Sequence, residues 1–231
     1  MHTIDPIGII ETPYQEKFAV PRQPRLVPAA TAKLKLLDDA NSPEALRGIE
    51  QFSHLWLLFL FDKNLAAGWK PTVRPPRLGG NERVGVFASR STFRPNGIGM
   101  SAVELKGVTK QGDQLYLQLG SVDLVNGTPI IDIKPYLPYS DSIIGAQGGY
   151  AESEPSLTSV TFSPSALALL NARDDSDTVI AVIEQVLAQD PRPAYKKNQV
   201  DNKEYAVNLF DLNVKFIVKQ QLVTVTTIEY F

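Results

Sequence analysis

Short β-type runs, interrupted by proline, glycine and asparagine, constrain the fold of this chain more than any other feature of its sequence. Gln114–Leu119 alternates polar with apolar residues, which is the period of a strand with one buried face. Residues 130–136 form a second such run, which is stopped by Pro135. The Asn-Gly pairs at 96–97 and 126–127 mark turns between runs of this kind. Many short strands with frequent turn signals predict a β-barrel or a β-sandwich for roughly the first 140 residues.

The other apolar runs of this region are also expected to be strands. The most apolar run, 52–61, contains aromatic residues and has the length of a strand that is buried on both faces. Ser42 followed by Pro43 is typical of a helix start, so we expect a short helix ending near Gly48. The remaining strand candidates are 7–10, 32–37, 84–88, 98–108 and 121–125.

The composition changes in the last third of the chain. Residues 137–160 are rich in proline, serine and glycine and are expected to form a linker or mobile loop. Ser163-Pro164 predicts a helix to about Ala172, and Asp177 is expected to cap a second helix that ends near Gln189. Alternating strands are expected at 205–210, 212–218 and 222–230. We therefore expect a mainly β protein with units at 1–140 and 161–231, the second of them a small α+β domain, joined by 141–160.

Positive charge is concentrated in one stretch, although the net charge of the chain is −2. Six basic residues and one acid, Glu82, lie between Lys70 and Arg94. Arg74-Pro75-Pro76-Arg77 cannot be helical, because proline removes amide donors and forces the residue before it into an extended conformation. Guanidinium groups on such loops present fixed forks of donors that suit carboxylates and phosphates. We favour a binding loop here over a solvated turn, and 21–25 and 190–197 repeat the proline-framed basic pattern.

Several kinds of chemistry are excluded by composition. The chain has no cysteine, which excludes disulfides, thiolate metal sites and cysteine nucleophiles. Its two histidines, His2 and His54, make a histidine-based metal cluster untenable, so we expect no metal. We expect no signal peptide, and the apolar run from Leu55 to Phe61 is too short to span a membrane. Walker loops, dinucleotide-type glycine fingerprints and Gly-x-Ser-x-Gly elbows do not occur.

Two functions remain open from the residues alone. One is a nucleic-acid-binding module, in which arginines grip phosphates and aromatic rings stack on bases. The other is an enzyme whose loops bind an anionic or nucleotide-like ligand. The acidic overall balance argues against broad nonspecific binding, while a local basic patch can still hold a structured RNA.

Five segments, taken in order, closely resemble the bacterial TrmO family, also called the TsaA-like or YaeB family. They are FAVPRQP at 18–24, FSHLWLLF at 52–59, WKPTVRPPRLGGNERVGVFASRSTFRPN at 69–96, SVDLVNGTPIIDIKPY at 121–136 and DPRPAY at 190–195. The resemblance implies a homodimeric, cytoplasmic tRNA methyltransferase with a β-barrel that holds S-adenosylmethionine and a small C-terminal domain. Its implied target is N6-threonylcarbamoyladenosine at position 37 of tRNA, which gains a methyl group on N6.

The resemblance also assigns residues to the cofactor. These are Pro21, Arg22, Gln23, Asp62, Lys63, Arg90, Asp123, Leu124, Val125 and Asn126. The family often has His-Gln where Asp62-Lys63 stands, a second proline in place of Gly97, and aspartate in place of Asn126. We expect backbone contacts with the cofactor to tolerate these differences better than contacts through the side chains.

Roles in the reaction follow as hypotheses. The methyl group on the sulfonium is strongly electrophilic, so the protein mainly supplies position and electrostatics. Asp123 is expected to hold the ribose or amino groups of the cofactor, and Arg90 and Arg94 a carboxylate or a phosphate. The candidates for the base are Tyr136, Asp132 and Tyr14. The expected tRNA contacts are Arg74, Arg77, Arg94, Arg192, Tyr195, Lys196 and Lys197. A noncatalytic RNA- or nucleotide-binding barrel remains the alternative, and it would show no cofactor-dependent methyl transfer.

Overall fold

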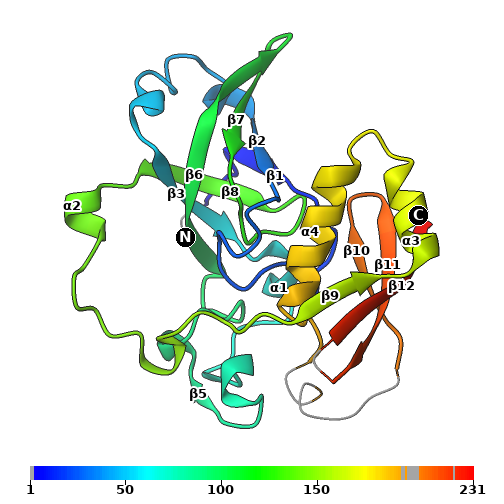
Figure 1. Cartoon of the computed structure of the whole chain (residues 1–231). Coiled ribbons are helices and arrows are strands. Elements are labelled where there is room, and N and C mark those ends of the chain that lie inside the picture. Colours follow the sequence, from blue (N-terminus) through cyan, green and yellow to red (C-terminus); the bar gives the residue numbers. More distant parts are fainter. Residues whose placement is uncertain (1–2, 194–195, 197–202, 221) are drawn as a thin grey trace.

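The computed structural model describes residues 3–193, 196, 203–220 and 222–231. Figure 1 shows two bodies. The first is the closed sheet of the N-terminal part, and the second is a separate sheet with its helices. The long helix α4 (Ser176–Ala188) lies between the closed sheet and the second sheet. Most of the regular structure is strand, so the prediction of a mainly β protein is confirmed. The short helical turns among the strands are η1 (Asp38–Ala40), η2 (Ile49–Gln51), α1 (Asp62–Leu65) and η3 (Pro76–Leu78).

Six antiparallel strands close into a barrel in the order β1-β2-β7-β6-β3-β8, and β8 pairs back to β1. Their bounds are β1 Gly8–Glu11, β2 Ala32–Leu36, β3 His54–Leu60, β6 Ile98–Gln111, β7 Gln114–Leu119 and β8 Pro129–Pro135. Apolar side chains at alternate positions, such as Leu34, Leu57 and Leu117, are fully buried. The predicted strands at 7–10, 32–37, 98–108, 114–119 and 130–136 all lie on this barrel.

The strand β3 differs from its prediction, because one of its faces is only half-buried. Leu55, Leu57 and Phe59 are buried, whereas the alternating residues Trp56 and Leu58 are partly exposed. The expectation of burial on both faces is therefore wrong. An apolar residue on an outward face need not be covered by another layer, and here this face borders a cavity.

Three loop regions also depart from the predictions. Residues 84–88 form β5 (Val84–Gly85), paired with β4 (Thr72–Val73), and then the 3-10 turn η4 (Val86–Ala88). Val86 is the buried residue of this turn, and Phe87 is 76% exposed. The pairing of β5 with β4 ends at Gly85, so the strand does not continue through 86–88. Residues 42–48 form turns rather than a helix, and 121–125 are irregular.

The second sheet has the order β10-β11-β12-β9. Its strands are β9 Ser159–Phe162, β10 Tyr205–Leu209, β11 Leu212–Lys219 and β12 Leu222–Tyr230. The helix α3 (Pro164–Asn171) begins as predicted, because the Ser163 hydroxyl accepts a hydrogen bond from the Ala166 amide (3.2 Å). The helix α4 begins at Ser176, so Asp177 lies in its first turn and is not its cap. The prediction missed β9, which pairs in parallel with the distant β12.

The connection between the two bodies follows a long, mostly irregular path over the surface. It contains α2 (Pro138–Asp141) and the short turn η5 (Gly149–Ala151), and Figure 1 shows it as a wide arc away from the barrel. Hydrogen bonds fix it at intervals: Trp56 Nε1 donates to Asp141 (2.8 Å), and the Tyr150 hydroxyl donates to the Ala88 carbonyl (3.0 Å). Hydrogen bonds thus hold this connecting segment against β3 and against the turn that follows β5.

The N-terminal segment 12–30 joins the barrel to the second sheet. Tyr14 forms a bridge with Leu209, and the Phe210 amide donates to the Pro13 carbonyl (2.7 Å). Farther along, the Ala29 amide donates to Gln185 Oε1 on α4 (2.9 Å). Buried side chains of both bodies form one continuous apolar core. The predicted loop at 21–25 is therefore held between the two bodies.

Candidate active site

One cavity of about 880 Å³ lies where the barrel, the N-terminal segment and the end of α4 meet. A volume of this size suits a cofactor or a drug-sized ligand. Side chains from β3 and β6 form one wall, and the loops 17–23 and 89–94 form two more. Residues 186–193, from the second body, complete the lining. Segments distant in the sequence therefore converge on one site.

Asp123 is the carboxylate that the barrel contributes to this cavity. Ser101, buried on β6, donates a hydrogen bond from Oγ to Asp123 Oδ1 (2.6 Å). Burial raises the pKa of Asp123 to about 6, and the opposing effects of the Ser101 hydrogen bond and the Arg90 charge lower it less. Asp123 is therefore a carboxylate that can bind a cation or exchange a proton near neutral pH.

The charged side chains of the lining are mostly basic. They are Lys17, Arg22, Arg90, Arg94 and Arg192, beside the acids Asp123 and Asp190. Arg90 donates to Gln23 Oε1, which links the loops at 21–23 and 89–94. Arg94 Nη1 donates to the carbonyls of Ser89 (2.7 Å) and Val86 (3.3 Å), so this guanidinium holds its own loop in shape. The cavity therefore favours a ligand with anionic or hydrogen-bond-accepting groups.

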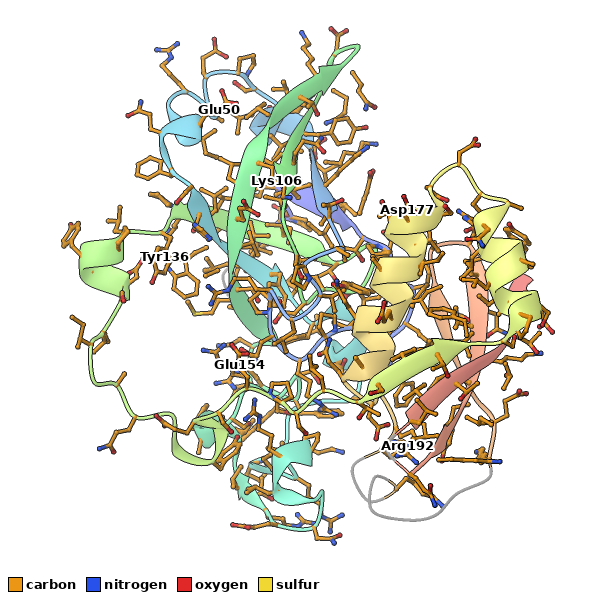
Figure 2. The ribbon with its side chains drawn as sticks, in the orientation of Figure 1. Glu50, Lys106, Tyr136, Glu154, Asp177 and Arg192 are labelled. Carbon is orange, nitrogen blue, oxygen red and sulfur yellow. The ribbon has the colours of Figure 1, made fainter. Side chains whose placement is uncertain are left out.

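Asp190 and Arg192 form a buried ion pair in the wall that the second body contributes. Arg192 is 5% exposed, and its Nε and Nη2 each donate to one carboxylate oxygen of Asp190 at 2.9 Å. Asp190 has a positive φ of 48°, so the backbone turns sharply at this point. Figure 2 shows Arg192 beyond the end of α4, on the side of the molecule away from Tyr136. The pair fixes the shape of this wall.

The remaining walls are apolar and aromatic. Trp56, Leu58, Phe59 and Phe61 line the cavity from β3 and the residue after it. Phe18, at the edge of the cavity, is 61% exposed. Apolar walls with a few placed polar groups are typical of sites for small organic ligands.

The structure brings half of the predicted cofactor residues into the cavity. These are Pro21, Arg22, Gln23, Arg90 and Asp123. Asp62 and Lys63 are exposed on α1, next to the lining residue Phe61. Leu124 is buried, Val125 is half-buried, and neither is part of the lining.

Asn126 lies three residues after Asp123, outside the cavity lining, and forms hydrogen bonds with the N-terminal segment. Its Oδ1 accepts from the Thr12 amide (3.1 Å), and its Nδ2 donates to Gln15 Oε1 (3.3 Å). The Asn126 amide also donates to the Tyr14 carbonyl (2.8 Å). Asparagine at this position is thus a structural link between the loop that holds Asp123 and the segment that leads to Pro21.

None of the three candidate bases lies in the cavity lining. Tyr136 stacks obliquely on Trp56, with ring centroids 5.6 Å apart. Asp132 pairs with Lys134 (2.7 Å) and borders a separate cavity of about 310 Å³. Tyr14 is fully buried, and burial raises the pKa of its phenol above the usual range, so it is a poor base at neutral pH. Its hydroxyl is buried, as is that of Ser121, whose hydrogen-bonding influence lowers this pKa less than burial raises it.

The predicted tRNA contacts fall into two groups. Arg94 and Arg192 line the cavity, whereas Arg74 and Arg77 are exposed on the outer loop, where Arg77 donates to the Ser153 carbonyl. Lys196 is half-buried and donates through its amide to the Pro193 carbonyl (2.8 Å). Tyr195 and Lys197 lie outside the described residues.

Sequence reasoning did not identify several residues of the lining. Lys17, Ser101, Gln189 and Asp190 were not proposed as site residues, although each lies in the cavity wall. Ser101 gives one local signal, since it is a buried hydroxyl in a strand whose other inward positions, such as Val103, are apolar.

Within the described ranges, no group of three or more His, Asp or Glu side chains is arranged to hold a metal ion. No described helix is long and apolar enough to cross a bilayer.

Comparison with known proteins links both bodies to one family. The model of the tRNA-methyltransferase O N-terminal domain matches residues 9–142, and that of the TrmO C-terminal domain matches 155–230. The tRNA (adenine(37)-N6)-methyltransferase of Escherichia coli K12 is 54% identical over 214 residues, 92% of this chain and 91% of the relative. A putative S-adenosylmethionine-dependent methyltransferase, RcsF, of Pseudomonas aeruginosa is 47% identical over 215 residues, with the same coverage.

A solved structure agrees with these matches in its fold. The crystal structure of TrmO from Pseudomonas aeruginosa superposes with a TM-score of 0.81 at 39% identity and covers 99% of this chain and 98% of its own. Both bodies, and the cavity between them, therefore lie within the region of likeness. The chain belongs to the TrmO family of tRNA methyltransferases.

Proposed function

We propose that this protein transfers the methyl group of S-adenosylmethionine to N6 of the adenine at position 37 of tRNA. The observation that supports it best is the cavity: it brings Pro21–Gln23, Arg90 and Asp123, the motif residues expected to bind the cofactor, to one place. The Escherichia coli relative with this printed activity matches 92% of the chain, and both family models belong to this family. We further propose that the accepted nucleoside is N6-threonylcarbamoyladenosine.

The cavity suits the charge of both substrates. Asp123 is placed to hold the amino group or the ribose hydroxyls of S-adenosylmethionine, because a half-buried carboxylate attracts cations and accepts hydrogen bonds. Gln23, already bound by Arg90, adds an amide to the same wall. The bound cofactor supplies an electrophilic methyl group, so the work of the protein is to orient the acceptor and exclude water.

The basic residues suit the acceptor nucleoside. Its threonyl carboxylate needs a cation, and Arg22 and Arg90 both line the cavity. The nitrogen N6 bears a carbamoyl group that makes its proton more acidic than that of plain adenine. A weak base therefore suffices, and Asp123 is the carboxyl of the lining that is not engaged with Arg192. Tyr136, Asp132 and Tyr14 remain alternative candidates for this role.

The assembly and setting of the protein are part of the proposal. We propose a cytoplasmic homodimer in which 1–140 bind the cofactor, 141–160 connect, and 161–231 contribute to binding of tRNA. The second body is a four-stranded sheet with two helices, and its first strand already begins at Ser159. Arg74 and Arg77, exposed on the outer loop, are available for phosphates of the anticodon arm.

The test is methyl transfer to tRNA taken from a strain that lacks its own enzyme. Purified protein is incubated with S-adenosylmethionine and this tRNA, and the nucleosides are then analysed by mass spectrometry. A gain of one methyl group on N6-threonylcarbamoyladenosine is the expected result. Cofactor and RNA binding without any gain would refute the proposed reaction and leave the noncatalytic RNA-binding barrel as the better description.

A further inference from the structure

Phe18 is an aromatic side chain at the cavity whose exposure nothing in the fold explains. It lines the cavity and is 61% exposed, whereas its neighbour Ala19 is buried. A large exposed apolar group beside a binding cavity commonly marks a contact surface. Its ring is a flat apolar face at the edge of the cavity, whose lining also includes the exposed apolar residues Met100 and Pro76.

The backbone around Phe18 is held firmly on both sides. The Ala19 amide donates to the Glu16 carbonyl (3.2 Å), which closes a tight turn. The Glu16 carboxylate accepts from the Asn208 amide of the second sheet (2.9 Å), and Lys17 Nζ donates to Asn64 Oδ1 after β3 (2.8 Å). The ring is thus presented by a turn anchored to both bodies, which reduces the entropy lost when a ligand stacks on it.

The surroundings favour a flat, electron-rich ligand with an anionic part. Lys17 and Arg22 flank the ring in sequence, and both line the cavity. Aromatic rings interleaved with cations are the usual surface for stacking nucleobases, because every base has a π face and, in a nucleic acid, lies near a phosphate. An aliphatic ligand would gain little from a single exposed ring.

We propose that Phe18 is a stacking platform for a purine ring at the mouth of the cavity. This inference rests on the proposed function, which supplies two purines: the adenine of S-adenosylmethionine and the modified adenine of tRNA. The chemistry is the same for both, and the experiment below separates them. Phe18 is proposed here as a binding residue and not as a proton donor or acceptor.

The test compares variants at Phe18 with a matched aromatic elsewhere. Phe18→Ala, Phe18→Leu and Phe18→Trp are compared with Phe231→Ala, which removes a ring of similar exposure (67%) at the end of the second sheet. Calorimetry measures the Kd for S-adenosylhomocysteine, and initial rates at saturating cofactor give the KM for tRNA. Loss of one stacked base is worth roughly 5- to 100-fold in affinity.

If the cofactor adenine stacks on Phe18, Phe18→Ala and Phe18→Leu raise the Kd for S-adenosylhomocysteine by that factor and Phe18→Trp restores it. If the target base stacks there, the same pattern appears in the KM for tRNA while the Kd is unchanged. If wild type binds S-adenosylhomocysteine through this ring but transfers no methyl group, the platform stands and the proposed reaction fails.

Three results overturn the proposal. The first is that Phe18→Ala behaves as Phe231→Ala does in both assays. The second is full retention of binding by Phe18→Leu, which would mean that apolar contact without stacking is enough. The third is that Phe18→Ala loses binding and also has a lower molecular mass than wild type by light scattering. The ring would then belong to a contact between two copies of the chain, and its loss would weaken binding by separating them.

Discussion

Replacing Asp123 by asparagine should make the protein more stable at neutral and alkaline pH. The folded protein holds the proton of this carboxyl up to a pKa of about 6, against an ordinary value of 3.8, chiefly because the group is buried. Asparagine removes the charge and keeps an oxygen that can accept the hydrogen bond from Ser101. The variant therefore avoids the cost of burying a carboxylate.

The size and direction of the effect follow from proton linkage. Between pH 3.8 and about 6 the folded state binds more protons at Asp123 than the unfolded state does, so the stability of wild type falls as pH rises through this window. Each pKa unit is worth about 1.4 kcal/mol, so the full penalty is about 3 kcal/mol above pH 6. Asp123→Asn should gain about this much at pH 7.5 and almost nothing below pH 4.

Urea unfolding, followed by circular dichroism at pH values between 4 and 8, measures the difference directly. Ser101→Ala is the matched control: it removes the hydrogen bond that lowers the pKa of Asp123, so it should destabilise most at high pH. A constant difference between Asp123→Asn and wild type across this range would refute the reasoning. So would a variant less stable than wild type at pH 7.5, because the carboxylate would then be stabilised by its partners.

Further substitutions test three local interactions: the buried ion pair of the site, the loop at Gly97 and the cap of α3. Arg192→Met should cost about 3–5 kcal/mol in urea unfolding, because the buried Asp190 carboxylate loses its guanidinium, and the double variant Asp190→Asn/Arg192→Met should cost less. Gly97→Ala should cost about 1–3 kcal/mol, since the residue has φ +61° and the new Cβ would lie 2.3 Å from Leu65 Cδ2. Gly127→Ala, at φ +82° with open space around it, is its control and should cost only about 1 kcal/mol by thermal melting. Ser163→Ala should cost about 1 kcal/mol through loss of the α3 cap, whereas equal stability of this variant and wild type would refute that role of the hydroxyl.

Sequence patterns predicted the strands that are regular over several residues. Gln114–Leu119 alternates strictly in sequence, Leu212–Lys219 does so except at Ile217, and both alternate in burial. The pattern failed at 84–88, a mostly apolar run with three β-forming residues that ends in a 3-10 turn, because local preference does not say whether a pairing strand is available. It failed at β3 for a related reason: the periodicity of a strand shows which residues share a face and not what covers that face.

The site was partly predictable through motifs and otherwise required the tertiary structure. Pro21–Gln23, Arg90 and Asp123 were named from the resemblance, and they line one cavity. Ser101 and Asp190 were missed because their roles depend on residues they contact after folding. Arg192 was expected on an exposed tRNA-binding loop, and its burial follows from the carboxylate two residues earlier. Gly97, at positive φ and tight against Leu65, shows that this loop has a local conformation that proline could not adopt.

The shared cavity gives the second body a part in the cofactor site, in addition to its proposed part in binding tRNA. The motif at 21–23 belongs to a segment tied to β10 through Tyr14 and Asn208 and to α4 through Gln185. The wall formed by Asp190 and Arg192 comes from the chain after α4. The second body therefore helps to position the loop that is expected to hold the cofactor. This arrangement explains how a chain of net charge −2 presents five cations around one cavity: the fold gathers them from three separate segments.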